Sequence, residues 1–205
     1  MDEYYDFFLK KFSPVFDHRE APGSSIAHYE NKLPERLLEY WHEYGWGGYA
    51  EGLFWVVNPQ EYEGLLEHWL ASTEFYLRDN YYVIARSAFG KLYVWGEKSG
   101  WCLTISPHAA RYSGRVSKFT GDRLSFGVSV FFAFVRPEHN DLNGLFKPAL
   151  EKLGQLNSDE MYGLVPALAL GGAMELKNLQ KVKAIEHLEF LSQLSPLRDW
   201  GFPEF

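Results

Sequence analysis

The sequence contains one pair of residues whose types and spacing could support nucleophilic catalysis. Cys102 is the only cysteine, and His108 follows it closely enough to serve as a general base for the thiol. Cys102, however, lies inside the apolar run 101–105, where a buried and unreactive thiol is the usual outcome. We therefore predict no catalytic residue. An enzyme that uses Cys102 is only the third hypothesis for the function, after two hypotheses of a binding protein that are given below.

No sequence pattern supports metal or cofactor chemistry. The seven histidines are dispersed, and none belongs to an HExxH motif or a similar ligand spacing. The glycine-rich segment 45–48 is not followed by the lysine or the helix start that a phosphate-binding loop requires. We expect neither a metal nor a cofactor, and the single cysteine excludes an intramolecular disulfide bond.

The negative charge of the chain is concentrated in one stretch. The formal net charge is −7, and residues 35–79 alone contain nine acidic and two basic residues. A protein that binds nucleic acid through phosphate neutralisation needs a basic surface, so the balance argues against that class. Two solvated helix faces would explain the acids. The more specific, functional interpretation is that these acids form a surface that binds a basic protein partner.

Aromatic side chains, which make up 18% of the sequence, support an alternative. Tyr81, Tyr82, Tyr93 and Trp95 lie on two predicted strands, where they could stack bases of a single-stranded nucleic acid. The region 91–147, with eight basic and four acidic residues, could supply the basic groove. A nucleic-acid-binding or regulatory module is therefore the second hypothesis, although cross-strand packing into a core is the more common role of such rings.

The hydrophobic pattern predicts helices and strands in alternation. Apolar residues recur at spacings of three and four in five segments that we predict to be helices. Two of them are 3–12 and 145–153, and a third begins at Pro34 and ends at Gly45. The remaining two begin after the capping residues Asn58 and Asn178. We expect strands over 53–57 and 81–105, with a hairpin around Phe89-Gly90.

Three other segments are harder to assign. Residues 13–32 are predicted to be an irregular connection, and residues 106–123 a further ribbon or a long loop. Residues 124–135 fit a strand and a helix equally well. The longest apolar runs are too short to span a bilayer, and the N-terminus is acidic where a signal peptide is basic, so we expect a cytoplasmic protein.

These elements predict an α+β fold. We expect a mostly antiparallel central sheet flanked by N-terminal helices, followed by a smaller helix-rich C-terminal domain. The predicted domains are 1–123 and 124–205, with the boundary anywhere within 106–144.

Three segments carry a family resemblance. LPERLLEYWHEYGWGGYAEGLFWVVNPQEY (33–62) and ARSAFGKLYVW (85–95) resemble the GAD-like domain, and distantly the SUKH-like immunity fold. Residues 146–194 resemble the Tdi-type C-terminal domain, most specifically in the pattern LGxLxxDExYGxVPALxLGG. Proteins with this pairing are type VI secretion immunity proteins.

The resemblance implies a cytoplasmic inhibitor without catalytic residues. Such a protein binds a cognate toxin, typically a DNase effector, and protects the producing cell and its siblings. A DNase presents a basic cleft to its substrate, which an acidic, aromatic-rich surface complements. The family offers no interface motif that could be transferred residue by residue.

Candidate toxin-binding residues therefore come from charge and position. The first group consists of acidic and aromatic residues near the glycine-rich segment 45–48, where we expect a tight turn, and on or just after the helix that Asn58 caps: Glu43, Trp46, Tyr49, Glu51, Glu63, Glu67, Glu74, Tyr76 and Asp79. The second group belongs to the C-terminal pattern and comprises Asp159, Glu160 and Tyr162. We assign the second group first to a structural turn and only then to toxin contact.

Overall fold

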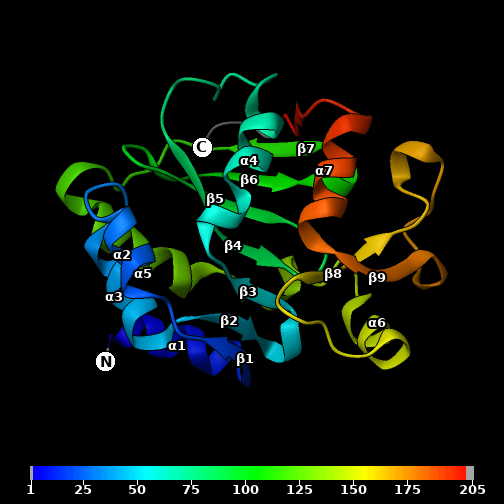
Figure 1. Cartoon of the computed structure of the whole chain (residues 1–205), viewed down its shortest axis with the longest axis horizontal. Coiled ribbons are helices and arrows are strands. Elements are labelled where there is room, and N and C mark those ends of the chain that lie inside the picture. Colours follow the sequence, from blue (N-terminus) through cyan, green and yellow to red (C-terminus); the bar gives the residue numbers. More distant parts are fainter. Residues whose placement is uncertain (1, 202–205) are drawn as a thin grey trace.

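An eight-stranded sheet crosses the centre of the molecule (Figure 1). The computed structural model describes residues 2–201. Neighbouring strands are antiparallel from β1 to β7, whereas β10 pairs in parallel with β7 at one edge. In spatial order the strands are β1 (Val15–Arg19), β2 (Trp46–Tyr49), β3 (Phe54–Val56), β4 (Tyr81–Ser87), β5 (Leu92–Gly96), β6 (Gly100–Ser106), β7 (Arg111–Gly114) and β10 (Arg198–Asp199).

Helices cover both faces of this sheet. One layer consists of α1 (Glu3–Lys11), α2 (Gly23–Tyr29), α3 (Glu35–Tyr44) and α5 (Leu124–Phe134). The other layer contains α4 (Glu63–Leu70), α6 (Phe146–Leu153) and α7 (Ala184–Leu194). A two-stranded antiparallel sheet, β8 (Glu160–Leu164) with β9 (Leu179–Lys183), lies beside α6 and α7 (Figure 1). The predicted α+β class with a mostly antiparallel sheet is confirmed.

Strand alternation divides the core into two apolar clusters. In β3, Phe54 and Val56 face the layer of α1, α3 and α5, whereas Trp55 between them faces the layer of α4 and α7. The first cluster is built largely from rings. Tyr5, for example, lies 4.3 Å from Tyr40 and 5.0 Å from Phe132 between ring centroids. Most of the aromatic side chains of the sequence are therefore packed inside the protein.

Several local predictions are confirmed. Helices α1, α3 and α6 begin and end within a residue or two of the expected positions. Gly45 ends α3 with φ of 62°, a left-handed conformation that glycine adopts without a side-chain clash. The Asn58 side chain accepts a hydrogen bond from the backbone N–H of Gln60 (3.2 Å) and caps the following helical turns. Residues 124–135 fitted a strand and a helix equally well in the sequence, and the structure decides for a helix: residues 124–134 form α5, whose Phe131 and Phe132 are fully buried.

Two segments that were harder to assign contain regular structure. Residues 13–32 form β1 and α2 instead of an irregular connection. Gly47 and Gly48 lie inside β2, next to β1. A Cβ atom on Gly48 would lie 2.5 Å from the Phe16 ring of β1, so the glycines allow the two strands to pack closely. In residues 106–123, Ser106 ends β6, and β7 is a further strand, in line with the ribbon that was one of the two alternatives.

The prediction for the last helix was wrong at its start. Asn178 does not cap it, because residues 179–183 form β9, which pairs with β8 from Leu164↔Leu179 to Glu160↔Lys183. Helix α7 begins at Ala184. The apolar residues of β9 matched helical spacing by coincidence, and the pairing partner decided the conformation. Within residues 2–201, no helix has the length and apolar composition that a membrane span requires.

Candidate functional site

A groove beside α4 brings together more of the candidate residues than any other part of the described surface. It has a volume of about 690 Å³, and its walls come from α2, α4, the 75–80 segment and the start of β4. Four candidates line it: Glu63, Glu67, Tyr76 and Asp79. Glu74 is exposed just before this segment. We call this region the α4 groove.

The sequence of α4 explains why its carboxylates reach the groove. Leu65, Leu66 and Trp69 are buried against the sheet. Glu63 and Glu67 are four residues apart, so they share the opposite, exposed face. The Tyr29 hydroxyl donates a 3.0 Å hydrogen bond to the Glu63 carboxylate. Burial of Tyr29, and next the nearby Glu63 carboxylate, raise the pKa of Tyr29 far above its ordinary value. The hydroxyl therefore keeps its proton and can hold Glu63 in place.

The 75–80 segment is fixed at both ends. Phe75 is buried and lies 5.5 Å from Tyr112 between ring centroids. At the other end, the Asp79 carboxylate accepts hydrogen bonds from the backbone N–H of Ser99 (2.9 Å) and of Lys98 (3.0 Å). Asp79 therefore organises the turn between β5 and β6, and its charge is partly used inside the protein.

Between these anchors, two apolar side chains point into solvent. Tyr76 is 44% exposed, and Leu77 is 85% exposed with φ of +64°. A leucine is strained in this left-handed region, and an exposed apolar side chain gains nothing from the solvent around it. The pair therefore has the character of a contact point held on a rigid loop.

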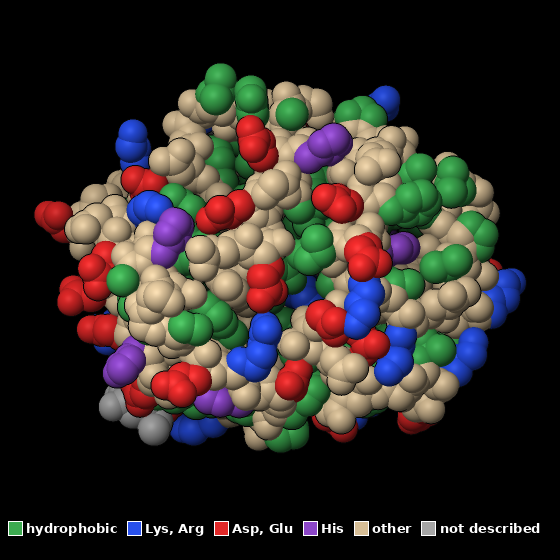
Figure 2. Space-filling view, in the orientation of Figure 1, with side chains coloured by type: hydrophobic (Ala, Val, Ile, Leu, Met, Phe, Trp, Pro, Cys, Tyr) green, Lys and Arg blue, Asp and Glu red, His purple; other side chains and the backbone are tan. Residues whose placement is uncertain are grey.

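Most acids of the 35–79 stretch have partners within the protein. Glu74 pairs with Arg78 at 3.0 Å, Glu51 with Lys147 at 2.5 Å, and Glu61 with Arg19 at 3.7 Å. The groove lining itself includes Lys32, Arg78 and Lys98. Exposed pairs of this kind are screened and contribute little energy. Acidic side chains still outnumber basic ones on the left of the face shown in Figure 2, where α2 and α3 lie.

The structure places the other first-group candidates away from this groove. Glu43 lines a separate surface cavity near Asp2 and Arg36. Trp46 is 4% exposed and packs against Trp41 at 5.8 Å, and Tyr49 is 1% exposed. Both rings are core residues, because β2 is a buried strand. They have no surface to offer a partner.

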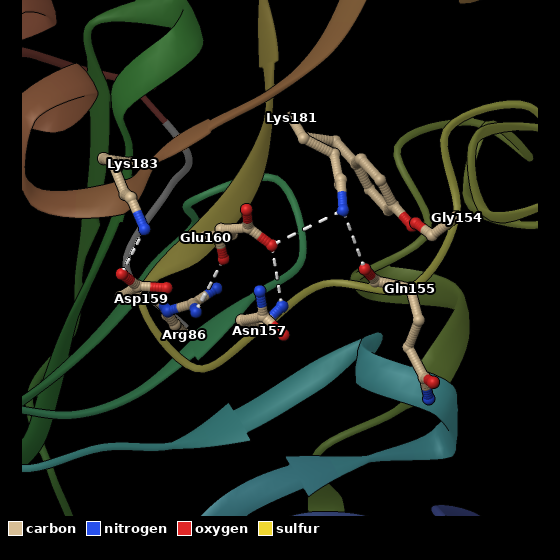
Figure 3. A network of polar contacts seen from close by, with 9 residues as sticks. Arg86, Gly154, Gln155, Asn157, Asp159, Glu160, Lys181 and Lys183 are labelled. Atoms are coloured by element: carbon tan, nitrogen blue, oxygen red, sulfur yellow. Dashed lines mark hydrogen bonds and ion pairs between the residues drawn. The ribbon is translucent and has the colours of Figure 1, made fainter.

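The second group forms a junction between the central sheet and β8 (Figure 3). Asp159 pairs with Lys183, and this contact holds the pKa of Asp159 below its usual value. The Glu160 carboxylate accepts a 2.9 Å hydrogen bond from the Asn157 N–H and lies 3.6 Å from the Lys181 ammonium. The buried Tyr162 donates to the Gly154 carbonyl (2.8 Å). All three side chains therefore contact neighbouring residues of the protein, and Tyr162 is buried among them.

Arg86 of β4 is the centre of this junction, and the sequence analysis missed it. Its side chain is fully buried, and Nη2 donates 2.8 Å hydrogen bonds to the carbonyls of Ser158 and Glu160. Figure 3 shows the second of these bonds. Its guanidinium also lies 4.9 Å from the Trp55 ring centroid. The available signal was a single charge within the apolar run 81–87, which indicates a buried cation with a fixed partner.

The chemical alternatives find little support in the geometry. Cys102 is 3% exposed, and burial raises the pKa of its thiol, so a reactive thiolate is disfavoured. No cluster of three or more His, Cys, Asp or Glu side chains in residues 2–201 could hold a metal ion. Of the four aromatic residues proposed to stack bases, Tyr82, Tyr93 and Trp95 are buried in the core. Their faces are therefore already covered.

Comparison with known proteins agrees with the resemblance. The family model of the GAD-like domain matches residues 3–109, and the model described as T6SS immunity protein Tdi1, C-terminal, matches residues 125–195. Among solved structures, the crystal structure of Atu4351 from Agrobacterium tumefaciens superimposes with a TM-score of 0.85. That alignment covers 97% of this chain and 94% of the other at 24% identity, which establishes a shared fold. No curated protein sequence matches the chain.

The two family matches follow one another along the chain and leave only short segments outside them. The first alone spans more than half of the residues. The chain therefore belongs to the GAD-like domain family, and it carries a C-terminal domain of the kind found in the type VI secretion system immunity protein Tdi1.

Proposed function

We propose that this protein binds and neutralises a cognate type VI secretion toxin, and thereby protects the producing cell from itself and its siblings. The observation that carries the proposal is the domain composition, a GAD-like domain followed by the C-terminal domain of an immunity protein. We further propose that the toxin is a DNase effector, that inhibition takes place in the cytoplasm, and that the protein has no catalytic role of its own.

The α4 groove is the proposed contact surface. Tyr76 and Leu77 supply exposed apolar anchors, and Glu63 and Glu67 supply carboxylates on the adjacent helix face. A nuclease needs a basic cleft to hold phosphates. Its arginine and lysine side chains would pair with the α4 carboxylates while the apolar pair fills a pocket at the centre of the interface.

The first experiment tests binding itself. The product of the adjacent open reading frame, with its catalytic residue inactivated, is co-purified with this protein, and the active toxin is co-expressed with it in growing cells. We expect a stable complex with a dissociation constant in the nanomolar range or below, about −12 kcal/mol, and restored growth. Absence of both the complex and the protection would refute the proposed function.

A second experiment locates the surface. Leu77→Asp and the double variant Glu63→Gln/Glu67→Gln are compared with Glu151→Gln/Glu189→Gln, a control pair of glutamates on α6 and α7. Leu77→Asp should raise the dissociation rate constant, since buried anchors mainly control dissociation. The α4 double variant should lower the association rate constant and its dependence on ionic strength, because charge steering acts on association. Normal rates for all variants would place the interface elsewhere while leaving the proposed function intact.

The adverse outcomes for the carboxylates are equally specific. If association with the toxin is independent of ionic strength, charge steering by α4 is wrong. If the control pair changes the rate constants as much as the α4 pair, the effect belongs to the net charge of the protein and not to the groove.

A further inference from the structure

A second cavity lies between the end of α5 and the strands β5, β6 and β7. It has a volume of about 1180 Å³, which is above the usual range for small-molecule clefts. Tyr93, Thr104 and Ser113 of the three strands line its floor, and Val130 and Phe134 of α5 line one side. The cavity exists because α5 ends at Phe134 and leaves this part of the sheet uncovered. We call it the α5 cavity.

Basic side chains predominate in this cavity, although the chain as a whole carries a net charge of −7. Lys91, Arg115 and Arg136 line it, against the single carboxylate of Glu138. Within residues 2–201, none of these three cations has a carboxylate within 4.0 Å, whereas Arg19, Arg36 and Arg78 all have one. The α5 cavity is thus a place where positive charge is left without a compensating anion.

Local contacts orient two of these cations. The Lys91 ammonium donates to the His139 carbonyl. The Arg115 guanidinium lies 3.2 Å from the centroid of the Trp101 ring, stacked on its face. Burial lowers the pKa of both Lys91 and Arg115, which means that an anion in the cavity would relieve an unfavourable charge.

The remaining lining offers hydrogen-bond donors and an exposed ring. In the described part of the chain, the hydroxyls of Thr104, Ser106 and Ser113 make no side-chain hydrogen bond, although Ser106 is only 7% exposed. The Nδ1 atom of His108 is buried without a partner as well. Phe134 is 62% exposed at the rim, where its face is open for stacking. Cations, hydroxyls and an open ring in one concavity match a ligand that has phosphate groups, further polar groups and a flat body.

We propose that the α5 cavity binds a ligand of the nucleotide class. The phosphate oxygens accept hydrogen bonds from Arg115 and Arg136, and the base stacks on Phe134. Such a ligand has two sources, a free nucleotide or the phosphorylated end of a nucleic acid strand. The acidic remainder of the protein repels a long polyanion, so the free nucleotide is the expected source.

The test is a calorimetric titration of the full chain with four probes. Adenosine diphosphate combines phosphate and ring, pyrophosphate lacks the ring, adenosine lacks the phosphates, and a 5′-phosphorylated single-stranded tetranucleotide represents a strand end. We expect saturable binding of adenosine diphosphate, and weaker binding of the other three. Equal affinity for adenosine, equal affinity for pyrophosphate, or no saturable binding at millimolar concentration would overturn the proposal. Tighter binding of the tetranucleotide would overturn the assignment to a free nucleotide.

Three variants connect binding to the cavity. Arg136→Gln removes an exposed cation, and Arg115→Gln removes the one stacked on Trp101. Each should weaken adenosine diphosphate binding by about tenfold or more, as expected for the loss of a charge-assisted hydrogen bond. Arg78→Gln, outside this cavity, is the matched control. Because Arg115 also packs on Trp101, the melting temperature of Arg115→Gln is measured in parallel. If that variant fails to fold, the affinity of Arg136→Gln alone tests the site. Equal affinities of Arg136→Gln and the wild type would refute the site.

Discussion

Replacement of Arg86 by methionine tests whether a single buried side chain joins the central sheet to β8. Methionine keeps most of the aliphatic stem beside Trp55 but removes both hydrogen bonds to the carbonyls of Ser158 and Glu160 (2.8 Å each). A hydrogen bond from a charged donor contributes about 1.5 kcal/mol at the low end of its range. We therefore expect a loss of about 3 kcal/mol in the free energy of unfolding, part of it from two carbonyls left without a donor.

Urea unfolding followed by tryptophan fluorescence measures this loss. With an m-value of about 3 kcal/mol/M, the expected change lowers the midpoint by about 1 M. Arg86→Lys keeps the charge but reaches fewer acceptors, so its midpoint should lie between those of Arg86→Met and the wild type. Arg78→Met, which removes only an exposed pair with Glu74, should change stability by less than about 0.5 kcal/mol. A midpoint of Arg86→Met within about 0.2 M of the wild type would show that the desolvation of the guanidinium cancels its hydrogen bonds, and would refute the reasoning.

Three further predictions concern pH and two backbone positions. Burial, and then Lys91, lower the pKa of His108 to about 4 in the folded protein, so the unfolded chain binds the extra proton between pH 6.5 and 4. The free energy of unfolding should therefore fall by at most about 3 kcal/mol as the pH drops through this window. Urea midpoints measured at each pH should show most of this dependence on pH lost in His108→Gln. Gly90→Ala should lower stability by about 2 kcal/mol in urea unfolding, since φ is +77° and the new Cβ would lie 2.6 Å from the Met161 methyl group. Leu77→Gly should keep or raise the melting temperature by relieving φ of +64°, while it weakens toxin binding.

Each of these predictions has a result that contradicts it. A full pH slope in His108→Gln would assign the effect to other groups, among them His187, whose pKa burial also lowers. Wild-type stability of Gly90→Ala would mean that Met161 moves aside without cost and that alanine tolerates the positive φ. A large drop in the melting temperature of Leu77→Gly would show that the side chain stabilises the loop despite its exposure.

The elements that the sequence predicted well are those in which local signals and tertiary packing agree. Helix α3 has an apolar stripe, a proline before its first residue and a glycine at its end, and each of these signals acts within a few residues. The shared face of Glu63 and Glu67 follows from helix geometry in the same way. For residues 179–183 the local pattern favoured a helix, and only the pairing with β8 decided for a strand.

The candidate site could be predicted only in part, for a related reason. Composition identified the acidic stretch, but burial depends on which strands have neighbours on both sides and helices packed over them, as β2 has. That is why Trp46 and Tyr49, close to acidic residues in sequence, are core residues in the fold. Arg86 was overlooked because its partners are backbone carbonyls 72 and 74 residues away. Backbone acceptors so distant in the sequence cannot be recognised from the residue types.

Helix α5 shows how the two family segments depend on each other. It belongs to the C-terminal match, yet its Val128, Phe131 and Phe132 complete the aromatic cluster of α1 and α3 from the N-terminal match. An exchange of C-terminal halves between relatives would therefore place a foreign α5 against a native α1 and lose complementary packing. Recombination that gives such a protein a new specificity should succeed more readily when the crossover falls after α5, in the 136–145 loop, than at the border between the two matches.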